Sequence, residues 1–332
     1  MVYWRAGHPT IFPMKLLDTF VHFSQRQYDC LDYDPFHPLL WYMGRHLGLI
    51  DKEALWLSTL YMAFYNIGSA YVAFVNGDPW KELPDWVLKL PIGVQRRNLR
   101  GGKVREHLLD FSRQALVAGG PVALLTQGFT DQPAPNWRAL QTTLDGVWGN
   151  GRWSNFTLGE LYQKVNHLPV LPTDIMNDGS SGPRAGLAYL CEVDPELSVE
   201  ELDKVAARLF KKVRPRISTD LPYMPHNHYD YGMLESQLCD FNSLRKGRYY
   251  IGRDIDRDQE RILATHAALE AMGQDTKRLD EVWAAREACF AKEYLGEFSG
   301  WIGRTQLANE YYLRTKRVAD HRTIRENEGV LV

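Results

Sequence analysis

Carboxylates and imidazoles lie in the polar segments between the apolar runs of this chain, where they could transfer protons. Asp174 and Asp178 occur in "PTDIMNDGSSGPRAGL", and His226, His228 and Asp240 occur in "PHNHYDYGMLESQLCDF". Side chains of these types most often act as general acids or bases. The five residues are therefore candidate catalytic groups. An ordinary turn at Asp178, and loop histidines on the surface, are the structural alternatives.

Metal ligation is the second chemistry that these residue types allow. The two histidines with Asp230 could bind a metal ion, but no predicted helix presents the histidines four residues apart on one face. Asp254, Asp256 and Asp258 alternate as in a calcium-binding loop. Such a loop needs a glycine where this chain has Gln259. We therefore predict no EF-hand and no resident metal or cofactor, and isolated magnesium ligation stays open.

A glycine-rich turn separates two segments that are both predicted to be helical. The stretch "VWGNGRWSNF" contains Gly149, Asn150, Gly151, Arg152 and Trp153. Helices are predicted over about 137–147 and 154–165, which is a helix-hairpin-helix pattern. Glycines permit positive φ, and the amides that open the second helix could then bind a phosphate, with Arg152 adding a charged fork. A plain hairpin whose glycines only reverse the chain is the alternative.

Three clusters of basic residues contain no acidic residue. They are "VQRRNLRGGKVR" with Arg96, Arg97 and Arg100, "RLFKKVRPR", and "LRKGRYYIGR" with Tyr249, Tyr250 and Arg253. The formal net charge of −2 gives the whole chain no attraction for a polyanion, so DNA binding would depend on local clusters. A solvated surface explains any one cluster well. Three clusters together favour phosphate contacts on one face.

Helical patterns dominate the elements that must position these residues. Ser198 followed by Glu201 is a capping box before an apolar periodicity. Residues 256–272 and 275–295 predict two further helices, with Gly273 as a C-terminal cap between them. The strand-like run is "RYYIGRDI". We predict a mainly α fold.

Domain organisation follows from the joints between these elements. The proline- and glycine-rich joints are short, and the chain has no repeat or low-complexity segment. We expect a single compact helical unit over 1–332, with the helix-hairpin-helix element at 137–165 and a C-terminal helical extension at 256–332.

An uncharged run over residues 54–75 is long enough to span a membrane. Its many hydroxyl and amide side chains favour instead a buried helix that breaks near Asn66 and Gly68. The four cysteines form no Cys-x-x-Cys pair, which is typical of reduced thiols in a cytoplasm. Because the uncharged run is expected to be a buried helix, no membrane association is expected.

Five short blocks, "NLRGG", "GNGRW", "SSGPRAGL", "LCDF" and "YYIGRDID", resemble the phage family of α-glutamyl/putrescinyl thymine pyrophosphorylases, and within it the amino acid:DNA transferases. The resemblance covers about 39–255 and implies a helix-hairpin-helix DNA glycosylase-like helical fold. It also implies hypermodification of double-stranded DNA in the cytoplasm of an infected bacterial host. A companion kinase converts 5-hydroxymethyluracil to a pyrophosphate ester, and the amino group of a free amino acid then displaces pyrophosphate.

The resemblance also implies roles for particular residues. Asp174 best fits the aspartate that follows the hairpin in glycosylases, and Asp178 is second. A base flipped out of the duplex would stack on Trp153, Tyr249 or Tyr250. The pyrophosphate clamp would come from Arg96, Arg97, Arg100 or Arg184, and the amino acid carboxylate would bind Arg184 or Arg253. Ser180, Ser181 and Asp254 complete the expected substrate contacts.

Two other functions remain open from the sequence. The first is a glycosylase or lyase on the same scaffold. Arg152 and Trp153 stand where a sugar-attacking lysine would be sought, which argues against strand cleavage. The second is a non-catalytic DNA-binding protein. The concentration of Asp, His, Tyr and Arg in loops favours an enzyme over a plain binder.

Overall fold

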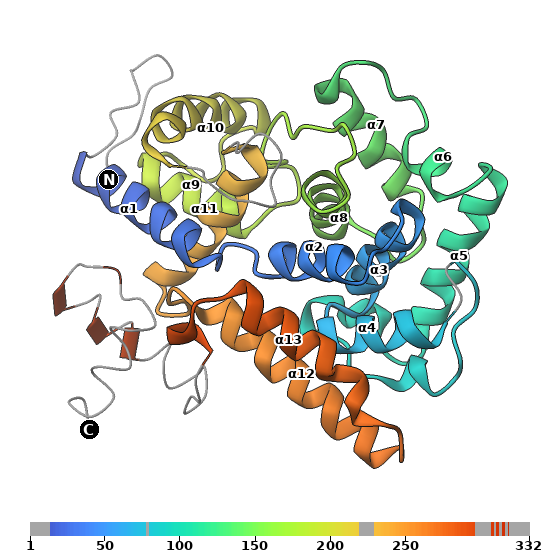
Figure 1. Ribbon diagram of the computed structural model, residues 1–332. Coiled ribbons are helices and arrows are strands. Elements are labelled where there is room, and N and C mark those ends of the chain that lie inside the picture. Colours follow the sequence, from blue (N-terminus) through green and yellow to red (C-terminus); the bar gives the residue numbers. More distant parts are fainter. Residues whose placement is uncertain are drawn as a thin grey trace.

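The computed structural model describes residues 14–77, 80–218 and 229–295, together with 307–308, 310–311, 314–315 and 318. Within these residues the chain is helical and forms no β-strand, so the predicted mainly α fold is confirmed (Figure 1). The α-helices are α1 (Met14–Cys30), α2 (Phe36–His46), α3 (Asp51–Phe64), α4 (Ile67–Asn76), α5 (Lys103–Val117), α6 (Pro121–Leu125), α7 (Pro133–Asp145), α8 (Arg152–Lys164), α9 (Gly182–Cys191), α10 (Val199–Val213), α11 (Tyr231–Arg245), α12 (Arg253–Ala271) and α13 (Asp280–Cys289). The 3-10 helices are η1 (Val87–Lys89), η2 (Val94–Leu99), η3 (Arg214–Arg216), η4 (Thr276–Leu279) and η5 (Lys292–Tyr294).

The uncharged run over 54–75 lies inside the protein as two helices. α3 ends where Tyr65 adopts a left-handed conformation with φ of 46°. Asn66 then caps α4, because its side chain accepts a hydrogen bond from the Ser69 amide at 3.2 Å. The predicted break near Asn66 is therefore correct. None of the described helices has both the length and the apolar character that crossing a bilayer requires.

The predicted helical hairpin is formed by α7 and α8, and its turn rests on α5. Asp110 accepts a hydrogen bond from the Trp148 amide at 2.8 Å, and Gln114 donates one to the Gly146 carbonyl at 2.9 Å. Gly149 has a φ of +84°, and a Cβ there would lie 2.8 Å from a methyl carbon of Leu99. The turn therefore does more than reverse the chain, since it fits against α5 and η2.

Two glycines bring α9 unusually close to α11. A Cβ at Gly182 would lie 2.5 Å from the Cys239 sulfur, and a Cβ at Gly186 would lie 2.1 Å from the Leu238 carbonyl oxygen. The two glycines are four residues apart, so they lie on the same face of α9. This close approach sets the first turn of α9 directly against α11.

The predicted strand at "RYYIGRDI" is not formed, because α12 begins inside that run at Arg253. Backbone amides of this run donate instead to the side chain of Asp32. Its carboxylate accepts hydrogen bonds from the amides of Gly252, Asp254 and Ile255, at 2.7, 3.0 and 3.1 Å. The first turn of α12 is thus capped by a residue more than 200 positions earlier in the chain.

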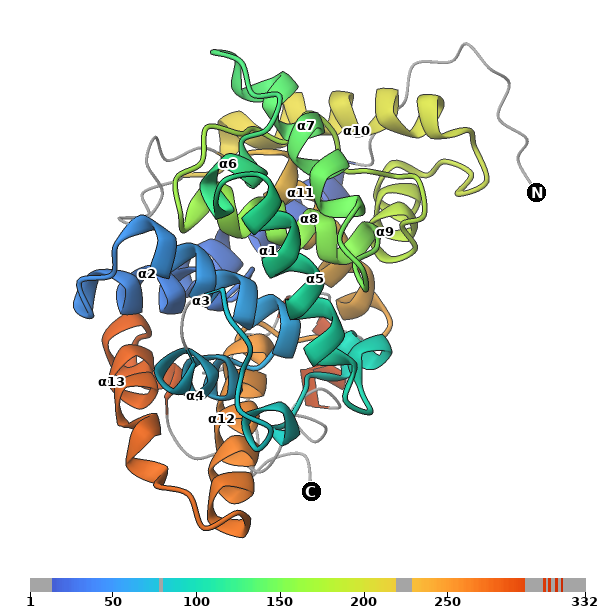
Figure 2. The ribbon, with the colours of Figure 1, turned by 90° about the vertical axis from the view of Figure 1, so that its right-hand side faces the viewer.

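The other predicted helix boundaries are close to those observed. Ser198 and Glu201 form the predicted capping box of α10, and Gly273 has the expected positive φ of 64° after α12. The helix predicted over 275–295 is instead divided into η4, α13 and η5. α12 and α13 meet at η4, and both helices pack against α4 (Figure 2).

Candidate functional site

A cleft of about 490 Å³ lies where the first residues of α8, the loop before α9, one face of α11 and the first turns of α12 meet. The segment between α1 and α2, the break at Tyr65 and Gln95 of η2 complete its lining. These elements are far apart in sequence, so the cleft exists only in the folded chain. Seven of the predicted site residues line it: Arg152, Trp153, Ser180, Ser181, Asp240, Arg253 and Asp254.

A row of three arginines on α12 forms one wall of the cleft. Arg253, Arg257 and Arg261 are four residues apart and therefore point to the same side of the helix. Sequence analysis identified only Arg253, although the spacing of the other two in the sequence would have shown the row. Each of the three forms an ion pair with an aspartate of its own helix, at 2.7–3.1 Å.

Aromatic rings cover another wall. Tyr65 and Trp153 meet edge to face with their centroids 4.9 Å apart, and the Arg261 guanidinium lies 4.7 Å from the centre of the Tyr65 ring. Phe36 and Tyr33 also line the cleft. Trp153 was expected to contact a base, whereas Tyr65 was not identified because it falls within a run that reads as core.

Asp240 and Asp254 lie on either side of Arg253 and have opposite pKa shifts. Burial raises the pKa of Asp240 to about 7, and Arg253, which is 3.3 Å away, only partly offsets this. Burial also acts to raise the pKa of Asp254, but the guanidiniums of Arg253 and Arg257 outweigh it and lower that pKa below its usual range. Near neutral pH, Asp240 can therefore exchange a proton, while Asp254 stays ionised.

Asp34 is a cleft carboxylate that the sequence did not reveal. It lies just before α2 and is followed by Pro35, and no sequence motif distinguishes it from an ordinary turn residue. Its carboxylate accepts a hydrogen bond from the Ser236 hydroxyl of α11 at 3.0 Å. Burial, and then Glu160, raise the pKa of Asp34 well above its ordinary value, against the opposing effect of Lys164.

A buried ion cluster lies beside these carboxylates. Lys164, the last residue of α8, pairs with Glu160 and lies 3.6 Å from Asp230. Burial acts to lower the pKa of Lys164, but Asp230, Glu160 and Asp34 raise it above its usual range. The amine of this lysine at the end of the hairpin is therefore held as an ammonium ion and is a poor nucleophile.

Arg152 has a structural set of contacts. Its guanidinium donates to Glu235 at 2.6 Å and to the carbonyl oxygens of Ile175 and Met176 at 2.6 and 3.0 Å. It therefore ties α8 to α11 and to the loop between them, and the expected free phosphate fork is not present in this conformation. Asn150 donates to the Leu144 carbonyl, and the Gly151 amide donates to Ser154.

Several predicted residues lie outside the cleft lining. Asp174 holds a turn by accepting a hydrogen bond from the Met176 amide at 2.8 Å, and Asp178 is exposed. Arg184 donates to the carbonyls of Pro195 and Leu197. Tyr249 and Tyr250 are fully buried and donate to Asp32 and Asp256, so neither ring offers a face to a base in this conformation. His226 and His228 fall outside the described residues.

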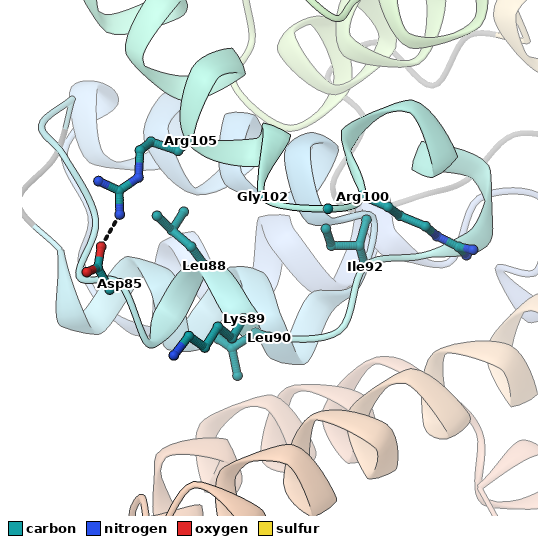
Figure 3. Close-up of a pocket in the computed structure, with 9 residues that line it drawn as sticks. Asp85, Leu88, Lys89, Leu90, Ile92, Arg100, Gly102 and Arg105 are labelled. Atoms are coloured by element: carbon teal, nitrogen blue, oxygen red, sulfur yellow. Dashed lines mark hydrogen bonds and ion pairs between the residues drawn. The ribbon is translucent and has the colours of Figure 1, made fainter.

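A second, open groove of about 590 Å³ is lined by residues of the 85–92 segment and of the 100–105 segment at the start of α5 (Figure 3). Lys89 and Arg100 line it, and the exposed Arg97 and Lys103 flank it. None of the four forms an ion pair with a described residue. Figure 3 shows Arg105 turned instead toward Asp85, with which it pairs.

Arg96 of η2 is buried and has no partner. Its Nε and one Nη atom are enclosed without a hydrogen bond, and no carboxylate among the described residues pairs with it. Burial lowers its pKa to about 10. Burying a guanidinium without a counter-charge is energetically costly. Elsewhere in the described residues, no group of three His, Cys, Asp or Glu side chains is arranged to hold a metal ion.

Comparison with known proteins gives one result. Residues 114–250 match the family model described as amino acid:DNA transferase, and no curated protein matches the chain. The matched segment runs from the end of α5 to Tyr250, so it supplies the α8, α9 and α11 sides of the cleft. α12 and Asp34 lie outside it. Over residues 114–250 the chain is therefore similar to the amino acid:DNA transferases, and it is a transferase.

Proposed function

We propose that this enzyme attaches a free amino acid, through its amino group, to a pyrophosphorylated 5-hydroxymethyluracil base in DNA and releases pyrophosphate. The cleft is the observation that carries the proposal. It combines an aromatic wall, a row of arginines and a carboxylate that titrates near neutrality, and much of its lining belongs to the family segment. A base kinase would have to act first, in the cytoplasm of an infected bacterial host, to supply the activated ester.

The aromatic wall suits a base that has left the duplex. The methylene carbon of a stacked base is out of reach, so an enzyme that modifies it must flip the nucleotide into a pocket. Trp153 and Tyr65 offer ring surfaces at the cleft, and their edge-to-face packing fixes both rings. Stacking of the pyrimidine on this wall would hold the methylene carbon inside the cleft.

The arginine row suits the leaving group. As the carbon–oxygen bond breaks, negative charge grows on the pyrophosphate, and guanidinium donors stabilise that charge more in the transition state than in the ground state. Arg257 and Arg261 are 23% and 15% exposed, so they reach the cleft while their aspartate partners hold them in place. Asp254 and Asp258 on the same helix prevent a bare cluster of like charges in the absence of DNA.

Asp240 is the proposed general base. The amine nitrogen forms a bond to the methylene carbon, the carbon–oxygen bond to pyrophosphate breaks, and the proton lost by the amine passes to a carboxylate oxygen of Asp240. A carboxylate with its ordinary pKa of about 3.9 would be a weak proton acceptor. A pKa of about 7 matches the task better, because general bases work best with a pKa near the working pH. The earlier candidate Asp174 lies outside the cleft lining, which favours Asp240.

The test is a transfer assay on defined DNA. Hydroxymethyluracil duplex is incubated with a base kinase, ATP, a mixture of the twenty protein amino acids and this enzyme, then digested to nucleosides for mass spectrometry. We expect a nucleoside whose mass equals that of thymidine plus one amino acid minus two hydrogens. Release of free base would identify a glycosylase instead, and unchanged nucleosides with DNA still bound would leave only a binding protein.

A further inference from the structure

The cleft contains one carboxylate that its own cations do not neutralise. Its arginines are each paired: Arg152 with Glu235, Arg253 with Asp240 and Asp254, Arg257 with Asp254, and Arg261 with Asp258. Asp34 forms no ion pair with any described residue, and its carboxylate receives a hydrogen bond only from the neutral Ser236 hydroxyl. Lys164 acts electrostatically on Asp34, but its ammonium group is paired with Glu160 and lies 3.6 Å from Asp230. A cation from outside the chain can therefore form the ion pair that Asp34 does not form within it.

The start of α9, in contrast to the Asp34 carboxylate, offers hydrogen-bond donors. Ser181 occupies the N-cap position but makes no capping hydrogen bond, so its side chain leaves the Gly182 and Arg184 amides of the first turn uncapped, while Pro183 between them has no amide hydrogen. Next to it, Ser180 is only 8% exposed, and its hydroxyl has no hydrogen-bond partner. Ser180, Ser181 and Gly182 all line the cleft. An uncapped helix N-terminus with a buried, unpaired hydroxyl is a setting that accepts an anion.

α11 fixes how far apart these two features are. Ser236 of α11 holds Asp34, and Cys239 of α11 contacts Gly182 at the start of α9. Three residues along an α-helix correspond to a rise of about 4.5 Å. The two α11 residues that contact these features are therefore about one helical turn apart, and both features line the same cleft. An ammonium group and a carboxylate that are bonded to the same carbon atom can therefore reach Asp34 and the start of α9 together.

We propose that the free amino acid binds here as a zwitterion, with its ammonium group on Asp34 and its carboxylate at the Ser180 hydroxyl and the first-turn amides of α9. This assignment rests on the proposed function and names its second substrate site. Arg184 and Arg253, the arginines first considered for the carboxylate, already donate to carbonyls and aspartates. The site selects substrates that carry both charges, so a decarboxylated amine would lose half of its contacts.

Binding of the amino acid can be measured without turnover. We would record saturation-transfer NMR of the twenty protein amino acids on the enzyme loaded with unactivated hydroxymethyluracil duplex, and titrate the amino acid that gives the strongest signal. Ser180→Ala and Asp34→Asn should each weaken its Kd by roughly 10-fold or more, because the first removes a hydrogen bond to the carboxylate and the second removes the negative charge that pairs with the ammonium group. Ethanolamine, putrescine, cadaverine and histamine, tested as a mixture, should give no signal.

Matched controls separate this effect from a loss of structure. Ser112→Ala removes a hydroxyl that is also unpartnered but lies on α5 outside the cleft lining, and Asp29→Asn removes an exposed aspartate from the end of α1. Both should bind like the wild type. Each variant is also compared with the wild type in melting temperature and in DNA affinity, and Ser180→Ala decides the matter if Asp34→Asn does not fold.

Two results would overturn the assignment: an unchanged Kd for the amino acid in both variants, or equal binding of the amine mixture. Failure of the proposed function is a different result. If the amino acid binds and the two variants lose it, but activated DNA yields no new nucleoside, the site stands and the transfer reaction does not.

Discussion

At the scale of single residues, the cleft depends on how each acidic group is paired. Asp254 receives two arginines and is kept ionised, Asp240 receives one and has a pKa of about 7, and Asp34 receives none. The same side-chain chemistry therefore gives three different proton affinities within one cavity. Asp240 has the one that proton transfer near neutrality needs.

Asp240→Asn should lower the rate of transfer by roughly 100-fold or more, because a positioned general base contributes at least that much. The wild-type rate should fall as the pH drops through about 7, since protonation removes the base, and the variant should lack this limb of the profile. The measurement is nucleoside yield against pH at saturating amino acid. Asp174→Asn is the comparison: if it abolishes transfer while Asp240→Asn remains active, the base is Asp174.

Arg152→Ala should destabilise the fold by about 3 kcal/mol, because it leaves Glu235 as a buried carboxylate without its partner. Urea denaturation measures the free energy of unfolding. Arg113→Ala, which breaks a pair whose arginine is 74% exposed, should cost less than about 1 kcal/mol. A loss of DNA affinity in Arg152→Ala with unchanged stability would instead show that its guanidinium leaves Glu235 to bind phosphate.

At the scale of elements, the hairpin turn is part of a three-way joint. His107 of α5 forms a 2.6 Å hydrogen bond with the Trp148 carbonyl, while Leu99 of η2 packs where a side chain at 149 would stand. The joint connects the turn to η2, which contributes Gln95 to the cleft and carries the unpaired Arg96. Movement of the turn would therefore be transmitted to both the cleft and the basic groove.

Gly149→Ala should destabilise the protein by about 1–3 kcal/mol, because its Cβ would overlap Leu99 and its positive φ disfavours a side chain. Gly151→Ala is a control from the same turn. Gly151 has an extended backbone with φ of −160°, and nothing lies within 4 Å of the new Cβ. Equal melting temperatures for the two variants would contradict the packed joint.

At the scale of the whole molecule, η2 and the residue after it contribute to both the cleft and the basic groove, and this suggests a path for DNA. Gln95 at the start of η2 faces the cleft, and Arg100 directly after η2 faces the groove. A duplex whose backbone crosses Lys89, Arg97, Arg100 and Lys103 could deliver a flipped base to the aromatic wall. The net charge of −2 gives the chain as a whole no attraction for a polyanion, so DNA binding depends on local clusters such as this one.

Replacing Arg100 and Lys103 together by alanine should weaken DNA binding for all sequences and make its salt dependence shallower. Each phosphate contact that is lost reduces the slope of log K against log salt by about 0.9. Fluorescence anisotropy at several salt concentrations measures that slope. The control is the exposed pair Arg208 and Lys211 on α10, changed in the same way. If the control changes the slope and the groove variant does not, the DNA path runs over α10.

Local sequence pattern was sufficient for the helical class, the break at Asn66, the capping box of α10 and the position of the hairpin. These features depend on contacts within a few residues, so short-range periodicity and cap chemistry encode them. The same pattern failed at residues 248–255, where Asp32, far away in the chain, caps α12 and replaces the predicted strand.

Tertiary structure decided which of the polar residues share a site. Composition could not separate Arg184, which braces the loop after α9, from Arg257 and Arg261, which face the cleft. Nor could it show that Asp34 forms no ion pair with a described residue while Asp254 forms two. Burial and ion pairing depend on contacts between distant segments of the chain. They determine whether a charged side chain stabilises the fold, accepts a proton or is available to bind a ligand.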